Sequence, residues 1–322
     1  MSDADERTGG GDLVDGDGAG AGDRLAALAA AESLADLTAL TGADDEHAAY
    51  FDAKREWAEL WRRRQQSSPG DADDAAALPG EVVTLGDTDF HVHGVTHAGT
   101  DAERSYLREG VVTMLSAGAT VYVEQGLRQL HFRDVDVCEM DDYRWALQRC
   151  DGFDDESDAF HEPLHGVGDR FDGLADQFRE TAFSLIESYS DLYGETVERT
   201  LGALASSLLT DHEGFATGDE YEAFALRRRA AADPAQLPAL QDYYRRAFLP
   251  QPVEREWVRR HDPDLEWVTH GRNERMADYA VYHYGDAEAV HLIVGAAHGP
   301  GVVYSLRQHR DGERFVEGFT VA

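Results

Sequence analysis

Hydrophobic positions follow two different periods along the chain, and the period of two is confined to a few short runs. Two such runs, 81–85 and 89–95, are separated by residues 86–88, in which Gly86 and Asp87 form the expected turn. Turn residues between alternating runs are typical of a β-hairpin. Helical spacing follows from about Ala102 to Ala117, where Gly118 should end the helix. Residues 120–124 then resemble a strand, and this strand–helix–strand order predicts a parallel pair with a right-handed crossover.

Helical spacing dominates residues 140–285. Helices are expected at 171–193, 195–209, 221–232 and 276–285. After them come a strand at 289–294, a Gly-x-x-His turn and a helix that runs through Leu306. Residues 315–321 are expected to form a closing strand. The fold class is therefore α/β, with a parallel or mixed central sheet and a large helical insertion.

The N-terminal part has a different composition. Residues 1–22 are rich in Gly and Asp and too poor in apolar side chains to pack, so we expect them to be disordered. Residues 23–42 and 45–66 have helical character, and 67–80 have the composition of a linker. The predicted organisation is a disordered segment (1–22), a helical extension with linker (23–80) and an α/β domain (81–322) whose insertion spans about 140–270.

The charge of the chain is strongly negative: 29 Lys and Arg residues face 63 Asp and Glu residues, for a net charge of −34. Such a field repels nucleic acids and anionic membranes, so neither is an expected partner. Lys54 is the only lysine. Dispersed acidity with so little lysine favours a halophilic protein, because at molar salt the screening length is only ~3 Å; the alternative is an acidic protein from ordinary salt.

Other compositional features point to a cytoplasmic protein. The N-terminus lacks the basic and apolar regions of a signal peptide, and no apolar run is long enough to cross a membrane. Cys138 and Cys150 are the only cysteines, and we expect both to be buried, reduced thiols. The chain has no Cys-x-x-Cys pair, so no thiolate metal site is indicated.

Two Gly-x-x-His motifs stand at opposite ends of the α/β domain. Gly94-Val95-Thr96-His97 and Gly295-Ala296-Ala297-His298 each follow a predicted strand. Ligands of α/β proteins gather at the carboxyl ends of strands. His97 and His298 could therefore share one pocket, although they are remote in sequence.

Glu124 ends the strand Val121-Tyr122-Val123 and would bring a carboxylate to the same edge. Burying a carboxylate is costly unless it is paired or coordinates a ligand. Two arginines are candidate partners: Arg128, one helical turn away, and Arg272, which could also bind a substrate carboxylate. Asn273 is a plausible N-cap of the following helix.

Two further groups of histidines are alternative candidates for a ligand site. His161-Glu162-Pro163-Leu164-His165 matches the zinc-protease pattern, but Pro163 interrupts the helix that this pattern requires, so an acidic loop is expected. His91 and His93 share one face of a strand, and we leave both out of the ligand set.

The order of four segments resembles the TraB/PrgY/GumN family, which is related to Tiki proteins, erythromycin esterases and haem-binding ChaN proteins. The segments are GVTH (94–97), VEQGLR (123–128), RNERMA (272–277) and VGAAHGPG (294–301). The resemblance covers roughly 82–130 and 268–322 and implies an erythromycin-esterase- or ChaN-like α/β fold. In Tiki-like members the corresponding site is associated with metal-dependent peptide hydrolysis.

This resemblance makes His97, Glu124 and His298 candidate ligands of Mn²⁺, Co²⁺ or Zn²⁺, with Glu124 and Arg272 as candidate catalytic residues. A bound ion would lower the pKa of a water molecule and polarise a scissile carbonyl. The first hypothesis is therefore a metal-dependent, peptidase-like hydrolase of peptides or small molecules. The alternative is a non-catalytic regulatory module that binds a peptide, haem or small anion.

Overall fold

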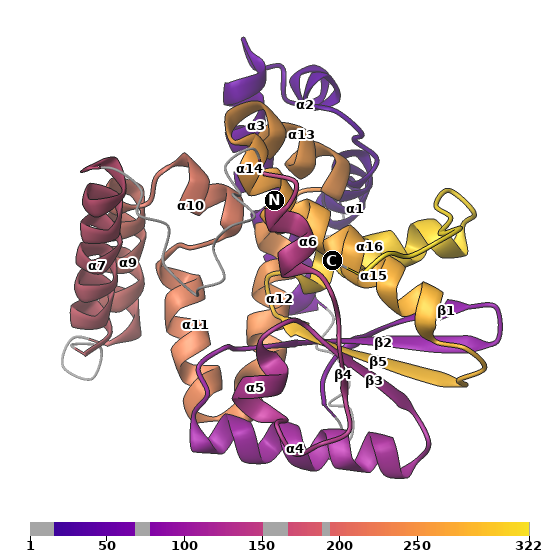
Figure 1. The fold of residues 1–322 in the computed structure, drawn as a ribbon. Coiled ribbons are helices and arrows are strands. Elements are labelled where there is room, and N and C mark those ends of the chain that lie inside the picture. The colour runs from indigo at the N-terminus through magenta and orange to yellow at the C-terminus, as the bar shows by residue number, and fades with distance from the viewer. Residues whose placement is uncertain (1–15, 68–77, 151–166, 189–193, 322) are drawn as a thin grey trace, which may run out of the picture.

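A computed structural model describes residues 16–67, 78–150, 167–188 and 194–321 (Figure 1). Its centre is a mixed five-stranded sheet in the order β1-β2-β5-β3-β4. The strands are β1 (Glu81–Leu85), β2 (Thr88–Val95), β3 (Thr120–Val123), β4 (Cys138–Glu139) and β5 (Ala289–Gly295). β1 and β2 form the predicted antiparallel hairpin, and the remaining neighbours pair in parallel. The general α/β prediction is thus confirmed.

The position of β5 corrects one prediction. β2 and β3 run in the same direction, but they are not paired, because β5 lies between them and bonds to both. Leu292, Ile293 and Val294 are all fully buried. A strand whose successive residues are apolar on both faces is most stable at the centre of a parallel sheet, with both faces covered, and these three residues have that character. The last strand in sequence therefore joins the two halves of the sheet.

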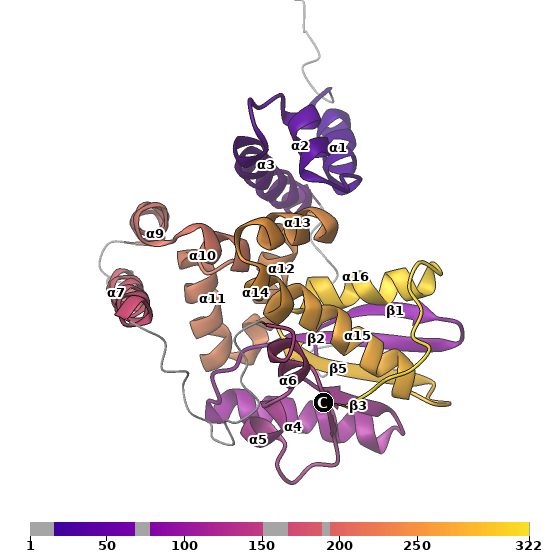
Figure 2. The same ribbon diagram turned by 45° about the horizontal axis from the view of Figure 1, so that its top comes forward.

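Helices cover both faces of the sheet (Figures 1 and 2). One core contains Leu107 and Val111 of α4 (Asp101–Ser116) together with Leu127 of α5 (Leu127–His131). The opposite core contains Met276 of α15 (Arg272–His283) and Val302 of α16 (Gly299–Arg310). The helix predicted near 102–117 is therefore present, and Gly118 follows it with φ of 85°.

The N-terminal helices pack on the insertion rather than on the sheet. They are α1 (Gly16–Ala29), α2 (Leu34–Thr41) and α3 (Glu46–Ser67). Tyr50 stacks on Trp257 of α13 (Gln251–His261), with ring centroids 4.1 Å apart. Two predictions are corrected. Residues 16–22 belong to helix α1. Residues 23–42 form parts of two helices instead of one, because the side chain of Ser33 accepts a hydrogen bond from Asp36 N–H and so caps the start of α2. Residues 1–15 and most of the predicted linker lie outside the described residues.

The insertion is helical, as predicted, and two of its helices have the expected bounds, α9 (Glu195–Leu209) and α11 (Tyr221–Ala232). Its other elements are α6 (Tyr143–Leu147), α7 (Val167–Ser188), α10 (His212–Thr217), η1 (Pro234–Gln236), α12 (Leu237–Ala247), α14 (Pro263–Glu266) and the π-helical turn η2 (Trp267–Gly271). η2 leads directly into α15, which explains why α15 begins four residues before the predicted start. The His161–His165 motif lies outside the described residues.

Two further predictions are wrong. Residues 315–321 form no strand; instead the ring of Phe319 lies 3.5 Å from the guanidinium of Arg275, whose Nη2 also donates to Thr320 O. Cys138 is exposed rather than buried, whereas Cys150 is partly buried. Among the described helices, none combines the length and apolar character needed to cross a membrane.

Candidate functional site

The carboxyl ends of β2, β3 and β5 bring the three predicted residues together. Glu124 directly follows β3 and extends its pairing, since its N–H donates to Ile293 O of β5 at 2.9 Å. Its Oε2 lies 3.6 Å from Nε2 of His97, and its Oε1 lies 3.7 Å from Nε2 of His298. The three side chains therefore form one cluster, centred on the carboxylate.

The carboxylate of Glu124 is buried and firmly held. Arg272 donates through Nη2 to Oε1 at 2.6 Å, and the Gly295 N–H donates to Oε2 at 2.5 Å. Arg272, rather than Arg128, is thus the arginine that pairs with Glu124. Burial acts to raise the pKa of Glu124, but His298, His97 and Arg272 outweigh it and bring the pKa well below its usual value. Glu124 is therefore ionised.

Asp142 is a member of the site that sequence reasoning missed. It is fully buried, and it accepts from Arg272 Nη2 at 3.0 Å and from Gln125 N–H at 3.2 Å. Burial raises the pKa of Asp142 to about 6, with Arg272 opposing the rise and Glu124 adding to it. One guanidinium thus separates two buried carboxylates. In a chain with 63 acidic residues, nothing in the sequence marks this one.

His298 is oriented by Asn273. Nδ1 of His298 lies 2.7 Å from Asn273 Oδ1, an acceptor, so Nδ1 carries the ring proton and Nε2 has the lone pair. Nη1 of Arg272 points at that lone pair from 3.4 Å. Burial lowers the pKa of His298 to about 4, with Glu124 opposing and Arg272 adding to the effect. His298 is therefore neutral at pH 7, and Asn273 lies within α15 instead of capping it.

His97 is the most accessible of the three, with 49% of its side chain exposed. Burial tends to lower its pKa, but hydrogen bonding and charge attraction to Glu124 outweigh this and raise the pKa above the usual value. The backbone of Gly295 approaches closely: a Cβ at this position would lie 2.6 Å from His97 Nε2. A side chain at 295 would therefore push the imidazole of His97 away from its place beside Glu124.

A third buried carboxylate, that of Glu103, holds the turn that carries His97. Glu103 accepts from the hydroxyl of Thr96 and from Gly99 N–H, the latter at 3.0 Å. His131 is buried next to it, with Nε2 3.8 Å from Glu103 Oε2. Burial, followed by the charges of Arg104 and His97, lowers the pKa of His131 to about 4. Neither Glu103 nor His131 was predicted as part of the site.

The arrangement is a poor fit for a divalent metal ion. The lone pair of His298 Nε2 suits a metal, but the guanidinium of Arg272 already contacts both that nitrogen and Glu124 Oε1. A divalent ion that used these two ligands would lie against a buried positive charge. Within the described ranges, no group of three or more His, Cys, Asp or Glu residues is placed to hold a metal. The set instead resembles a hydrogen-bonded acid–base site.

His91 and His93 are engaged elsewhere. Nε2 of His93 lies 2.9 Å from Nδ1 of His291 on β5, and the ring of His91 stacks on His291 with centroids 4.5 Å apart. These three histidines form their own cluster along β2 and β5. They were left out of the predicted ligand set, and the structure places them in contact with one another rather than with Glu124.

Comparison of the chain with protein-family models, with curated proteins and with solved structures finds no match.

Proposed function

We propose that the protein is a hydrolase of ester or amide bonds in which His97 activates water without a metal ion. The observation that carries this proposal is the position of Glu124, ionised and buried beside the exposed imidazole of His97. A carboxylate next to a histidine stabilises the imidazolium that forms when the ring takes a proton. The motif resemblance to the TraB/PrgY/GumN family, whose Tiki-like members are associated with peptide hydrolysis, supports the same reaction class.

The chemistry would run through His97. Its imidazole takes a proton from water, the hydroxide attacks the carbonyl carbon, and the imidazolium returns the proton to the leaving oxygen or nitrogen. Glu124 stabilises the charged ring. Arg272 and Gly295 N–H hold Glu124 in place, and His298 packs against Oε1 on the other side. His298 stays neutral and acts as a positioning residue.

The test is hydrolysis of chromogenic esters and of a peptide library after exhaustive chelation, with and without added Mn²⁺, Co²⁺ or Zn²⁺. General-base catalysis contributes about 10²–10⁴-fold, so His97→Gln and Glu124→Gln should each lose activity in this range. His91→Gln is the matched control, because His91 lies outside the cluster, and it should keep wild-type activity.

Three outcomes would contradict the proposal. Activity that returns only with added metal would favour the metal-dependent hydrolase predicted from the resemblance. Activity that survives both site substitutions would place the chemistry elsewhere. A protein that hydrolyses none of the probes would favour the regulatory alternative.

A further inference from the structure

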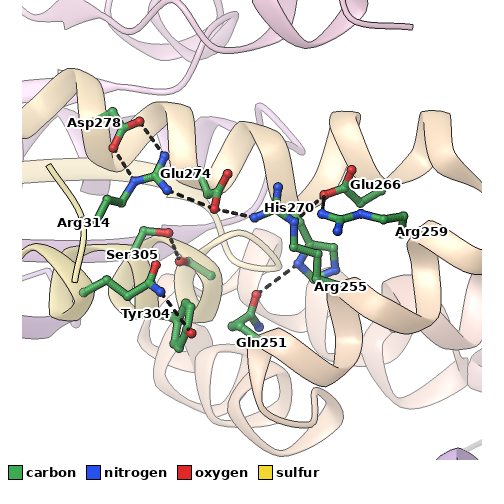
Figure 3. Close-up of polar contacts among 12 residues, drawn as sticks. Gln251, Arg255, Arg259, Glu266, His270, Glu274, Asp278, Tyr304, Ser305 and Arg314 are labelled. Atoms are coloured by element: carbon green, nitrogen blue, oxygen red, sulfur yellow. Dashed lines mark hydrogen bonds and ion pairs between the residues drawn. The ribbon is translucent and has the colours of Figure 1, made fainter. Parts of the chain in front are cut away.

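A separate polar cavity of about 240 Å³ lies next to the cluster, on the other side of Asn273. Its walls come from α13, η2, α15 and α16 (Figure 3). The residues that matter here are Gln251, Arg255, Arg259, His270, Asn273 and Tyr304. None of His97, Glu124 and His298 lines it. At ~30 Å³ per water molecule, the cavity holds about eight waters or one small metabolite-sized molecule.

One wall of the cavity carries two guanidinium groups a helical turn apart on α13. Arg255 donates to Glu266 and Glu274, and Arg259 donates through Nη2 to Glu266 at 3.1 Å (Figure 3). Glu266 is buried behind them and does not line the cavity. The charged groups on the wall itself are therefore two arginines and Glu274. Arg259 remains 57% exposed, so a guanidinium with five donors has capacity for a ligand.

His270 reaches the cavity from η2. π-Helical turns are rare and occur frequently at functional sites. Nδ1 of His270 lies 3.2 Å from Gln251 Oε1 (Figure 3). Burial lowers the pKa of His270 to about 3, and the guanidinium charge of Arg255 adds to this effect. His270 is therefore a neutral imidazole on the cavity wall.

The opposite wall offers neutral polar groups. The hydroxyl oxygen of Tyr304 accepts from Gln308 Nε2 at 3.2 Å, which leaves the hydroxyl hydrogen to be donated. Ser305 donates to Gly301 O at 3.1 Å on the same helix. The cavity thus has two guanidinium groups on one wall and neutral polar groups on the other, a distribution that suits a small molecule with an acidic group at one end.

We infer that this cavity binds a small hydroxycarboxylate, with the carboxylate beside Arg255 and Arg259 and a hydroxyl group against Tyr304. Arg pairs bind carboxylates through charge-assisted hydrogen bonds, which are roughly twice as strong as neutral ones. The inference goes beyond the proposed hydrolysis. The ligand would lie behind Asn273 and contact neither His97 nor Glu124.

The experiment is calorimetric titration of the full chain with L-malate, inorganic phosphate and glycerol. Malate should bind saturably, and glycerol should not bind. Tighter binding of phosphate than of malate would show that the site selects phosphate and would overturn the carboxylate assignment. Arg259→Gln should weaken malate binding by about tenfold or more, since it removes a charged donor. Tyr304→Phe should weaken it less.

Arg260→Gln is the matched control. Arg260 neighbours Arg259 on α13 but pairs with Glu46 and Glu256 instead of lining the cavity, so its substitution should leave malate affinity unchanged. Equal losses in Arg259→Gln and Arg260→Gln, or no saturable malate binding, would overturn the inference. His97→Gln should bind malate like the wild type. A protein that binds malate but hydrolyses no probe would support this inference and contradict the proposed function. A protein that hydrolyses the probes but does not bind malate would do the reverse.

Discussion

Replacing Arg272 by Met should destabilise the protein strongly. The side chain of Arg272 is mostly buried and holds two buried carboxylates, Glu124 at 2.6 Å and Asp142 at 3.0 Å. Removing one partner of a buried ion pair costs about 3–5 kcal/mol, because the remaining charge is left uncompensated. At about 2 °C per kcal/mol for a large domain, the melting temperature should fall by roughly 6–10 °C.

The loss should depend on pH. Arg272 lowers the pKa of both Glu124 and Asp142, so both values rise without it. The pKa of Asp142 is then raised still further above the unfolded value of about 3.9. A folded state that holds protons more tightly than the unfolded state loses stability as pH rises through the raised pKa values. The part of the difference between Arg272→Met and the wild type that comes from Asp142 should therefore shrink as pH falls toward about 6, which is the pKa of Asp142 when Arg272 is present.

Urea denaturation at several pH values, at constant high salt, measures this difference. Arg128→Met is the control, since Arg128 was the other candidate partner of Glu124 and is a partly exposed residue of α5; surface changes of this kind usually stay within ~0.5 kcal/mol. The reasoning is refuted if Arg272→Met loses less than ~1 kcal/mol, or if it loses no more than Arg128→Met.

Three further predictions concern other parts of the structure. Gly295→Ala should lower the proposed hydrolytic activity at least tenfold (about 1.4 kcal/mol in the barrier), because its Cβ would lie 2.6 Å from His97 Nε2, whereas Gly299→Ala, with open space around its Cβ, should keep the activity. Burial lowers the pKa of His93 to about 4 and that of His291 to about 3. Below pH ~6.5 the unfolded chain therefore binds more protons than the folded chain, and the stability should fall as the pH drops below about 6.5. Melting curves recorded at several pH values should show a smaller fall for His291→Gln. Lys54→Met should destabilise by roughly 3 kcal/mol in urea, because it leaves the fully buried Glu254 without its ion-pair partner; a loss below that of an exposed substitution such as Arg55→Met would contradict this.

Local patterns predicted local elements well. The β1–β2 hairpin follows from alternating residues around Gly86 and Asp87, and α9 and α11 follow from uninterrupted helical spacing. The place of β5 was not predictable in this way, because a pattern shows that a segment is a strand without showing its neighbours. Only its three consecutive apolar residues, Leu292, Ile293 and Val294, indicated a central position.

Errors of prediction arose where tertiary contacts decided the structure. Residues 315–321 alternate like a strand, but Phe319 packs on Arg275 and the backbone of Thr320 accepts from the same guanidinium. Residues 16–22 have the composition of a disordered segment, yet they extend a helix whose later turn packs Leu25 and Leu28 into the N-terminal core. Composition alone does not predict such contacts.

For the site, the sequence identified His97, Glu124, Arg272 and His298, because each stands beside a strand end or a helix start. Asp142, Asn273 as the partner of His298, and Glu103 were missed. Their roles come from contacts between elements far apart in the chain, such as Asn273 Oδ1 to His298 Nδ1 at 2.7 Å. The expected metal ion stays a prediction, and the contacts of Arg272 favour a site without one.

The most direct test of the cluster is the pKa of His97, measured by NMR titration in the wild type and in Glu124→Gln, with the resonance assigned by its loss in His97→Gln. Glu124 is what raises this pKa against the effect of burial. The wild-type value should lie above ~6.5 and should fall below ~6.5 in Glu124→Gln, where burial remains without the carboxylate. An identical pKa in the two proteins would mean that Glu124 does not lie beside His97, and the proposed site would not exist.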